Sequence, residues 1–428
     1  MRIGIVTDVS QFRRKWLEEA MAEEMYQTNT VKEMKKVLSE SFDVFHYVFD
    51  KDLVKKLKED QIDLVFNLAN GYKNHQDRGE LPALLDREKI PYTGSNALGH
   101  GIADDKELAS RVLEKNNIAT PKTFAIQSVF DISRYQFDFP VLVKPNNEGS
   151  GRGITNKSIV YNKEDLQSLL QEMLDSYQPP VLVTEYIDGK EITVGALGNG
   201  EDVEILPILE IDFSELPDGV EKIYSFEVKH DFEENTHYYL PGRFSPEETQ
   251  CIQSTAKKVF LSLGLRDYCR IDMRFKDGIP YVLEINSLAG INHESSDIVK
   301  MSEHIGMDYS ELLNRIVKLA IDRYHLKDEG KEGNRDLQKL AQERMVENIQ
   351  AREQDIEEHK KAGTLPQKYS ESSEMYKSDE TKMRLSSLHG HLESLVSAVI
   401  EVQEEILSLQ EFVREIEENS IDKNKKDE

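Results

Sequence analysis

The chain has little cysteine, no long apolar run and no excess of basic residues. Its 428 residues include only two cysteines, Cys251 and Cys269, and no CxxC pair. This usage excludes a disulfide framework and a thiolate metal site, and it is typical of a reducing compartment. No apolar segment is long enough for a membrane span or for the core of a secretory signal. We therefore expect a soluble, cytoplasmic protein.

The scarcity of basic charge limits the partners. Lys and Arg number 54 against 80 Asp and Glu, which gives a formal net charge of −26. Such a surface repels nucleic acids and anionic membranes, so we predict neither as a partner. Any site for an anion must then be a local pocket. The length suffices for two or three domains with hydrophobic cores.

The first hundred residues show the pattern of an open α/β unit. "RIGIVTD" (2–8) and "IDLVFNLAN" (62–70) are short apolar runs separated by helical segments, which predicts parallel strands. In such sheets the functional residues collect at the carboxyl ends of the strands. "IPYTGS" (90–95) is a third strand-to-turn signal, and the helix that follows it has Asp104 near its N-cap.

The middle of the chain reads as strands and loops around "FPVLVKPNNEGSGRGI" and "VLVTEYIDGKEITVGALGNG". Helices are expected from about Lys163 to Tyr177 and from about Pro246 to Leu263. Between the second helix and further helices around Met307 to His325, "DYCRIDMRFKDGIPYVLEIN" predicts a hairpin that turns at Asp277-Gly278.

The last hundred residues are charge-rich and poor in glycine. From Leu385 to Ile416, apolar residues recur at alternating spacings of three and four, which predicts a coiled coil over 383–420. The alternative is an amphipathic helix packed on the protein's own body. Residues 327–382 are expected to form a charged, partly helical linker.

The predicted hairpin carries acids on one face. Side chains at i and i+2 share a face, so Glu284 lies with Asn286, and Asp272 lies with Arg270. Asp272 can face Glu284 only if the connecting loop has an odd number of residues or the pair contains a bulge. Two carboxylates and a carboxamide then converge, a ligand set that suits Mg²⁺ beside a nucleotide. The alternative is a half-exposed hairpin whose acids pair only with Arg270 and Arg274.

Two other segments complete such a site. Lys144 ends an apolar strand, where an ammonium is costly unless it meets an anion. The following loop from Glu148 to Gly153 can bring backbone amides to phosphate oxygens, although a plain flexible turn explains it equally well. Glu185 follows another apolar strand and Glu191 comes six residues later; alone, both acids would be assigned to solvated surface.

The order of these pieces resembles the ATP-grasp superfamily, and the D-alanyl-D-alanine ligases within it. The resemblance rests on "VKP", the Gly-rich loop, "EYIDGKEITVGALGN", "VKH", "RID" and "LEIN", and it extends through "IPYTGS" to Lys106. It implies an α/β ATP-grasp fold: an N-terminal open parallel domain (1–100), then an ATP-grasp domain (101–326) with a lid subdomain (120–188) and a C-terminal subdomain (189–326). An all-helical tail follows.

The resemblance also implies a reaction and its residues. A carboxylate attacks the γ-phosphate of ATP, and an amine captures the acyl phosphate to give an amide, ADP and phosphate. Two Mg²⁺ ions assist, with Mn²⁺ as an alternative. The implied nucleotide ligands are Lys106, Lys144, Glu148, Ser150, Glu185, Tyr186, Ile187 and Glu191. The implied metal ligands are Asp272, Glu284 and Asn286. The implied catalytic residues are Arg270, Lys229, Ser150 and Gly290, and the implied substrate residues are His230, Ser295 and Ser296.

The chain also departs from the ligase pattern. The ligases carry a glutamate after the first strand that binds the ammonium of the first D-alanine, but "TDVSQFRRKWLEEA" has none in register. His230 stands where the ligases have tyrosine, and Asn286 to Gly290 reads NSLAG where Asn-Thr-x-Pro-Gly is usual. The nucleotide half therefore looks intact, whereas the substrate half looks altered.

Three functional hypotheses follow. The first is an ATP-dependent carboxylate–amine ligase that joins small amino acids or related carboxylates. The second is D-alanyl-D-alanine ligase itself, with the ammonium held by a glutamate such as Glu18 or Glu80. The third is a nucleotide-binding scaffold without turnover, whose coiled coil recruits partners. We expect a homo-oligomer formed through the body, the coiled coil or both, and a protein partner at the coiled coil.

Overall fold

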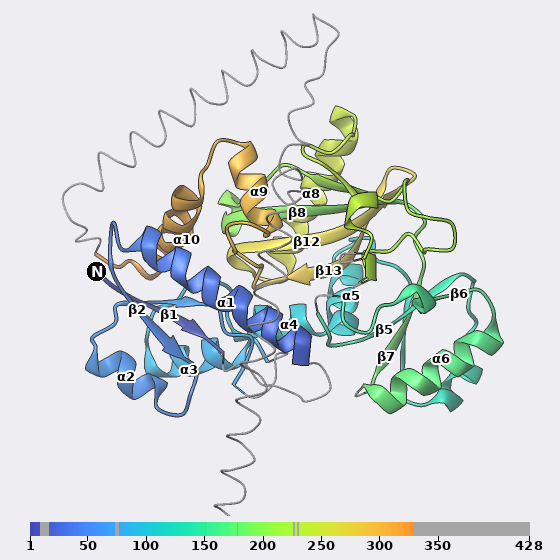
Figure 1. The fold of residues 1–428 in the computed structure, drawn as a ribbon, viewed down its shortest axis with the longest axis horizontal. Coiled ribbons are helices and arrows are strands. Elements are labelled where there is room, and N and C mark those ends of the chain that lie inside the picture. The colour runs from blue at the N-terminus through green and yellow to red at the C-terminus, as the bar shows by residue number, and fades with distance from the viewer. Residues whose placement is uncertain are drawn as a thin grey trace, which may run out of the picture. The chain divides into compact units, whose positions relative to one another are not determined.

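A computed structural model describes residues 1–8, 17–72, 77–149, 151–177, 179–225, 227–228 and 231–327 (Figure 1). The predicted coiled coil, and the linker beyond residue 327, lie outside the described residues. Within them, the chain builds three sheets in succession, each covered by helices. No helix in the described part of the chain is both long and apolar enough to cross a membrane.

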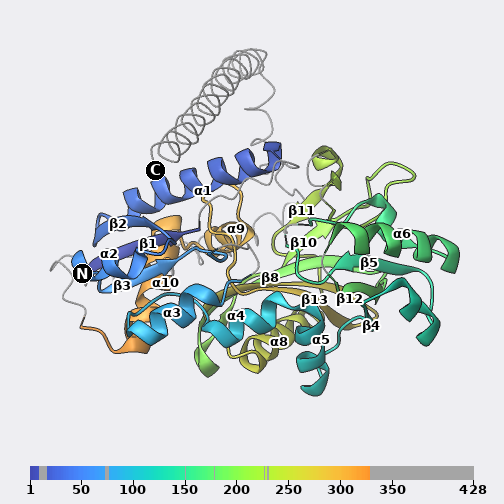
Figure 2. The same ribbon diagram turned by 90° about the horizontal axis from the view of Figure 1, so that it is seen from below.

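The first sheet is parallel, with strand order β2-β1-β3. Alternate side chains of β1 enter two different cores: Ile3 and Ile5 pack with α1 and α10, whereas Val6 packs with α2 and α3. In Figure 2, α1 and α3 are seen on opposite sides of these strands. The elements are β1 (Arg2–Thr7), α1 (Leu17–Leu38), β2 (Asp43–Val48), α2 (Leu53–Glu59), β3 (Leu64–Asn67) and α3 (Glu80–Glu88).

The predicted strand at "IPYTGS" is reduced to a single bridge between Val65 and Tyr92. The chain then turns at Gly94, whose φ of +91° suits glycine, and enters two helices. These are α4 (Ala97–Asp104) and α5 (Lys106–Lys115). The N-cap of α5 is Asp105, which accepts a hydrogen bond from the Leu108 amide, while Asp104 ends α4. The predicted cap thus shifts by one residue.

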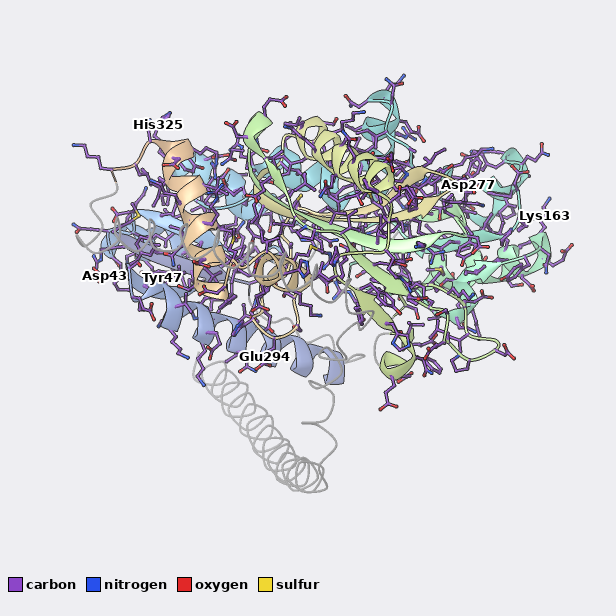
Figure 3. The ribbon with its side chains drawn as sticks, turned by 90° about the horizontal axis from the view of Figure 1, so that it is seen from above. Asp43, Tyr47, Lys163, Asp277, Glu294 and His325 are labelled. Atoms are coloured by element: carbon purple, nitrogen blue, oxygen red, sulfur yellow. The ribbon has the colours of Figure 1, made fainter. Side chains whose placement is uncertain are left out.

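The second sheet is antiparallel, with order β4-β7-β5-β6, and α6 covers it. In Figure 3, Lys163 at the start of α6 lies at the opposite end of the molecule from Asp43 and Tyr47 of the first sheet. The elements are β4 (Thr123–Ile126), β5 (Val141–Pro145), β6 (Ile159–Val160), α6 (Lys163–Ser176) and β7 (Val181–Glu185). The division into domains that the sequence suggests stays a prediction.

The third sheet is antiparallel, with order β11-β10-β8-β12-β13 and β9 beside β8. One face of β8 and β12, including Ile192, Val194, Ile271 and Met273, packs in a core with α8. On the opposite face, Thr193, Arg270 and Asp272 form a polar cluster, while Leu197 and Tyr268 pack in a core with α9 and α10. The elements are β8 (Lys190–Asn199), β9 (Glu204–Ile205), β10 (Leu209–Asp212), β11 (His237–Tyr239), α8 (Pro246–Ser262), β12 (Arg266–Lys276), β13 (Ile279–Asn286), α9 (Asp297–His304) and α10 (Tyr309–Tyr324).

A buried ion pair joins α10 to the third sheet beside the turn at Gly94. Asp267, fully buried at the start of β12, accepts from Arg323 of α10 at 2.7 Å and from the Gly94 amide at 2.7 Å. Asn199 donates to the same carboxylate at 2.9 Å. The Asp267 carboxylate therefore offsets the charge of Arg323, and its two oxygens accept from three separate segments.

We predict that Asp267→Asn destabilises the fold by about 3 kcal/mol, because it leaves a buried guanidinium without its counter-charge. Asparagine tolerates the positive φ of this position (+62°), so backbone strain does not contribute. The urea unfolding midpoint measures the effect. The control is Asp322→Asn, since Asp322 is 61% exposed and pairs only with Lys318; equal losses in the two variants would contradict the prediction.

Candidate functional site

The hairpin of β12 and β13 brings the predicted metal ligands together. A two-residue turn at Asp277-Gly278, with φ of +50° and +79°, pairs Lys276 with Ile279. The register shifts between Asp272 and Met273, so that Asp272 faces Glu284. Leu283 is the extra residue of this β-bulge. The bulge is the second of the two arrangements that the sequence allowed, and it places the acids on one face.

The carboxylate of Asp272 is the most heavily bonded group on this face. Arg270 donates to it through Nε and Nη2, both at 2.9 Å, and Thr193 of β8 donates at 2.6 Å. Asn286 donates through Nδ2 at 2.8 Å. The Arg270–Asp272 pair is the contact that the alternative interpretation expects, but Glu284 pairs with Lys106 instead, and the carboxamide of Asn286 joins the same cluster.

Arg270 also lies 3.4 Å from Asp297 at the start of α9. Burial lowers the pKa of Arg270, but Asp272, Asp297 and Glu284 outweigh it and raise the pKa above its ordinary value. The guanidinium is therefore a fixed positive charge on the site face.

Two lysines face Glu284 from other elements. Lys106, in the first turn of α5, lies 3.2 Å from its carboxylate, and Lys144 of β5 approaches the Leu283 carbonyl at 3.5 Å. Burial alone raises the pKa of Glu284, but Lys106 and Lys144 outweigh it and lower the pKa below its ordinary value. Burial and the charge of Lys106 lower the pKa of Lys144 to about 8. Two ammonium groups thus share a buried space, and an anion beside both would relieve their repulsion.

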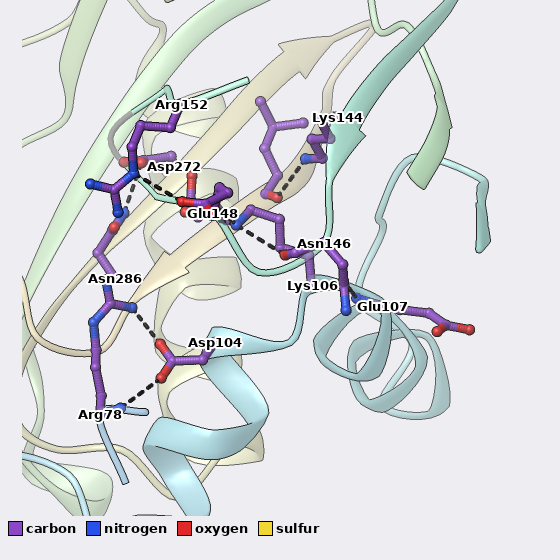
Figure 4. Close-up of polar contacts among 12 residues, drawn as sticks. Arg78, Asp104, Lys106, Glu107, Lys144, Asn146, Glu148, Arg152, Asp272 and Asn286 are labelled. Atoms are coloured by element: carbon purple, nitrogen blue, oxygen red, sulfur yellow. Dashed lines mark hydrogen bonds and ion pairs between the residues drawn. The ribbon is translucent and has the colours of Figure 1, made fainter. Parts of the chain in front are cut away.

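The base of the Gly-rich loop is fastened to α5 (Figure 4). Lys106 donates to the carbonyls of Glu148 at 2.6 Å and Asn146 at 3.3 Å. Asn146 in turn accepts from the Glu107 amide and donates to Asp105, both at 3.0 Å. Arg152 closes the turn with a 2.9 Å bond to the Glu148 side chain. The loop base is therefore held in place, in contrast to the plain flexible turn that the sequence left open.

The segment after β7 connects the second sheet to the third. The amide of the exposed Glu185 donates to the Lys122 carbonyl at 2.8 Å, and the Lys122 amide donates to the Glu185 carboxylate at 3.3 Å, while Ile187 is buried. Glu191 accepts from Arg274 at 2.7 Å, and Arg274 donates to the Ile187 carbonyl at 2.7 Å. Arg274 thus pairs with Glu191, and not with the hairpin acids as the alternative interpretation has it.

Tyr186 is another predicted nucleotide ligand in the segment between β7 and β8. Its ring lies 5.0 Å from the Arg274 guanidinium, and its hydroxyl donates to the Lys222 carbonyl. Three of the four predicted adenosine ligands, Tyr186, Ile187 and Glu191, are therefore neighbours of a single arginine.

The predicted substrate serines lie in the loop before α9. Ser295 donates through its hydroxyl and its amide to the Asn292 side chain, at 3.0 and 3.2 Å. The Ser296 hydroxyl is buried and accepts from the Asn292 amide at 2.8 Å. Asn292 also donates to Thr30 of α1 at 3.0 Å. The loop thereby contacts the first domain, and Figure 3 places Glu294 beside α1.

Gly290 is exposed ahead of this loop. Ser150, Lys229 and His230 lie outside the described residues, and their predicted roles stay predictions. Glu80, one of two glutamates considered for a substrate ammonium, accepts from the Tyr72 amide at 2.7 Å.

Sequence reasoning missed Arg78, and it considered Arg274 only as a partner of the hairpin acids. Arg78 pairs with Asp104, and Arg274 is only 3% exposed beside Glu191. Neither arginine lies in a recognisable motif, because the acid with which each one pairs is distant in sequence. The one usable signal for Arg274 was its position on the same strand face as Arg270 and Asp272.

The residues present fit both nucleotide phosphates and Mg²⁺. Lys106 and Lys144 supply paired positive charge in a buried space, and the two carboxylates and the carboxamide supply hard oxygen ligands. In the described part of the chain, no cluster of three or more His, Cys, Asp or Glu residues could hold a metal. A site with only two acids suits Mg²⁺, which keeps waters and phosphate oxygens as its remaining ligands.

Comparison with known proteins agrees with this geometry. Residues 112–318 match the family model described as D-ala D-ala ligase C-terminus. A D-alanine–D-alanine ligase of Thermotoga maritima is 34% identical over 278 residues, which covers 64% of this chain and 86% of the relative. The chain belongs to the D-alanine–D-alanine ligase family. As a member of this family it is an ATP-dependent ligase, and the family uses ATP and Mg²⁺.

Two further similarities are informative. An uncharacterized protein of Sinorhizobium fredii is 33% identical over 262 residues, covering 61% of this chain and 75% of the relative. The crystal structure of a D-alanine–D-alanine ligase from Bacillus anthracis complexed with ATP has a TM-score of 0.57 at 24% identity, covering 76% of this chain and 99% of that one. The α/β ATP-grasp fold predicted for the described residues is thus confirmed.

The low pKa of Lys144 leads to a pH prediction. Its ammonium is half deprotonated at about pH 8 and is lost as the pH rises further, whereas a bound phosphate favours the charged form. We expect Mg·ATP binding at pH 8.5 to take up a proton, and the affinity to fall by up to tenfold per pH unit above 8. Calorimetry in two buffers of different ionisation enthalpy measures the uptake. Lys144→Met should abolish it and the exposed Lys157→Met should not; uptake that survives Lys144→Met would refute the assignment.

Proposed function

We propose that the protein is an ATP-dependent carboxylate–amine ligase that joins small amino acids or related carboxylates through an acyl phosphate. The observation that carries this proposal is the convergence of Lys106, Lys144, Asp272, Glu284 and Asn286 on one polar sheet face. Each belongs to a segment on which the resemblance to the family rests, and the contacts of Lys106 with Glu284 and of Asn286 with Asp272 support the proposal.

The chain's own residues have distinct tasks in this proposal. Lys106 and Lys144 bind phosphate oxygens, and Arg274 orients Glu191 for the ribose of the nucleotide. Asp272, Glu284 and Asn286 hold Mg²⁺, which offsets phosphate charge during transfer. Arg270 and the Gly290 amide stabilise the oxyanion that forms when the amine attacks.

The substrates are less closely defined by the described residues than the nucleotide is. Ser295 and Ser296 would hold the carboxylate of the second substrate in a loop braced by Asn292. For the first substrate, the departure from the ligase pattern after β1 favours an acid other than D-alanine. D-alanyl-D-alanine ligase itself remains the second candidate, favoured by the match to the family's C-terminal model.

A substrate panel tests the proposal. We expect phosphate release from Mg·ATP with at least one pair among D- and L-amino acids and hydroxy acids, and an amide or ester product by mass spectrometry. Glu284→Gln should lower the rate at least 100-fold, since it removes a metal ligand and the counter-charge of Lys106. Glu59→Gln, at a 63% exposed side chain, is the control.

The outcomes separate the hypotheses. Turnover with D-alanine alone would identify the second candidate. No turnover with any pair, under conditions where Mg·ATP binds, would rule out the ligase and favour a nucleotide-binding scaffold.

A further inference from the structure

Arg78 lies between the first domain and the Gly-rich loop. It follows β3, whose carboxyl end faces the switch point of the parallel sheet, where ligands of such sheets bind. Its Nε donates to Asn70 at 3.1 Å, and its Nη1 donates to Asp104, the last residue of α4. The Arg78 amide also donates to Asp104, at 3.2 Å. Two of the three guanidinium nitrogens are therefore fixed.

The third nitrogen points to the loop. A Cβ atom placed on Gly149 would lie 3.7 Å from Arg78 Nη2, so the guanidinium passes directly beside this glycine. Within the described residues, no hydrogen-bond acceptor for Nη2 is present. A guanidinium that is 19% exposed and fixed on two sides thus presents a donor toward the phosphate loop.

The surroundings of this donor match phosphate chemistry. Glu148, the neighbour of Gly149, has its carbonyl bound by Lys106, and Lys106 also contacts Glu284. Asp104 and Lys106 are two residues apart at the junction of α4 and α5. One short segment therefore orients Arg78 through Asp104 and supplies a second cation through Lys106. Figure 4 shows both contacts from this segment.

We propose that Arg78 is an additional catalytic residue, whose Nη2 donates a hydrogen bond to the γ-phosphoryl group as it is transferred. The inference rests on the proposed ligase function. A carboxylate oxygen of the first substrate bonds to the γ-phosphorus while the bond to the β–γ bridging oxygen breaks, and that electron pair leaves with ADP. Arg78 transfers no proton; it stabilises the negative oxygens of the moving group, and it is held in place before they arrive.

The competing explanation is an ion pair that serves only to fasten α4 to the first domain. In that case removing either partner should have the same effect. If Arg78 instead binds the phosphoryl group, Asp104→Asn keeps the guanidinium and should be much milder than Arg78→Met.

Two probes that differ at the γ position test the proposal. Mg·ADP lacks the γ-phosphoryl group, whereas Mg·ADP with aluminium fluoride mimics it during transfer. Calorimetry on the full chain gives both dissociation constants. We expect Arg78→Met to leave Mg·ADP binding within twofold and to weaken the aluminium fluoride complex at least tenfold. Arg78→Lys should fall between, because lysine lacks the planar fork.

Two further variants serve as comparisons. The loss of affinity for the aluminium fluoride complex should be at least fivefold smaller in Asp104→Asn than in Arg78→Met. Arg111→Met is the matched control, because Arg111 is 72% exposed on α5 and pairs only with Glu107. In turnover with ATP, Arg78→Met should lower kcat at least 30-fold with little change in KM for ATP.

The results separate this inference from the proposed function. Equal weakening by Arg78→Met and Asp104→Asn, or an unchanged aluminium fluoride complex in Arg78→Met, would overturn the role of Arg78 alone. The role of Arg78 would also be overturned if aluminium fluoride did not strengthen the binding of Mg·ADP to the wild-type protein. A wild-type protein that does not bind Mg·ADP would overturn the proposed function as well.

Discussion

The site depends on the ammonium of Lys106. Its three protons serve three acceptors from two different sheets: two carbonyls at the base of the Gly-rich loop and the carboxylate of Glu284. This one group fixes the separation between the second sheet and the hairpin of the third. Lys106 is already positioned by oxygen atoms of the protein. An anion that binds this ammonium therefore replaces some of these contacts, and the pocket does not have to form on binding.

The polar face of the third sheet shows how an acidic protein can build an anion site. The net charge of −26 disfavours anions at long range. At this site, however, three cations are each held by a specific acid: Arg270 by Asp272, Arg274 by Glu191 and Lys106 by Glu284. Lys144 instead lies against the Leu283 carbonyl. The opposite face is apolar and packs on α8, so the strand alternation alone separates the site from the core.

Much of this arrangement could be predicted from local sequence. The turn at Asp277-Gly278 and the shared face of Asp272 and Glu284 follow from turn chemistry and strand periodicity. Whether a bulge or an odd loop would align the acids could not be decided, because both satisfy the same pattern. The two-residue turn with positive φ at both positions settles it in favour of the bulge.

Contacts between segments that are distant in sequence could not be predicted from the sequence. Arg78 and Asp104 are 26 residues apart, and Arg274 faces Glu191 on the neighbouring strand β8. No short motif therefore marks either pair. The strand expected at "IPYTGS" shortens to one bridge because the chain turns away at Gly94 to start α4. Ser150, Lys229 and His230 lie where the structure gives no description, and the resemblance to the ligases is their only support.

The bulge at Leu283 has a consequence for how this hairpin can change in evolution. Between the bulge and the turn, the four paired residues on each strand (273–276 and 279–282) could be shortened or extended in matched pairs without moving Asp272 or Glu284, since pairing is preserved. A single inserted or deleted residue, in contrast, would turn one acid toward α8. Length variation among relatives should therefore be even in number at the tip of the hairpin and absent at its base.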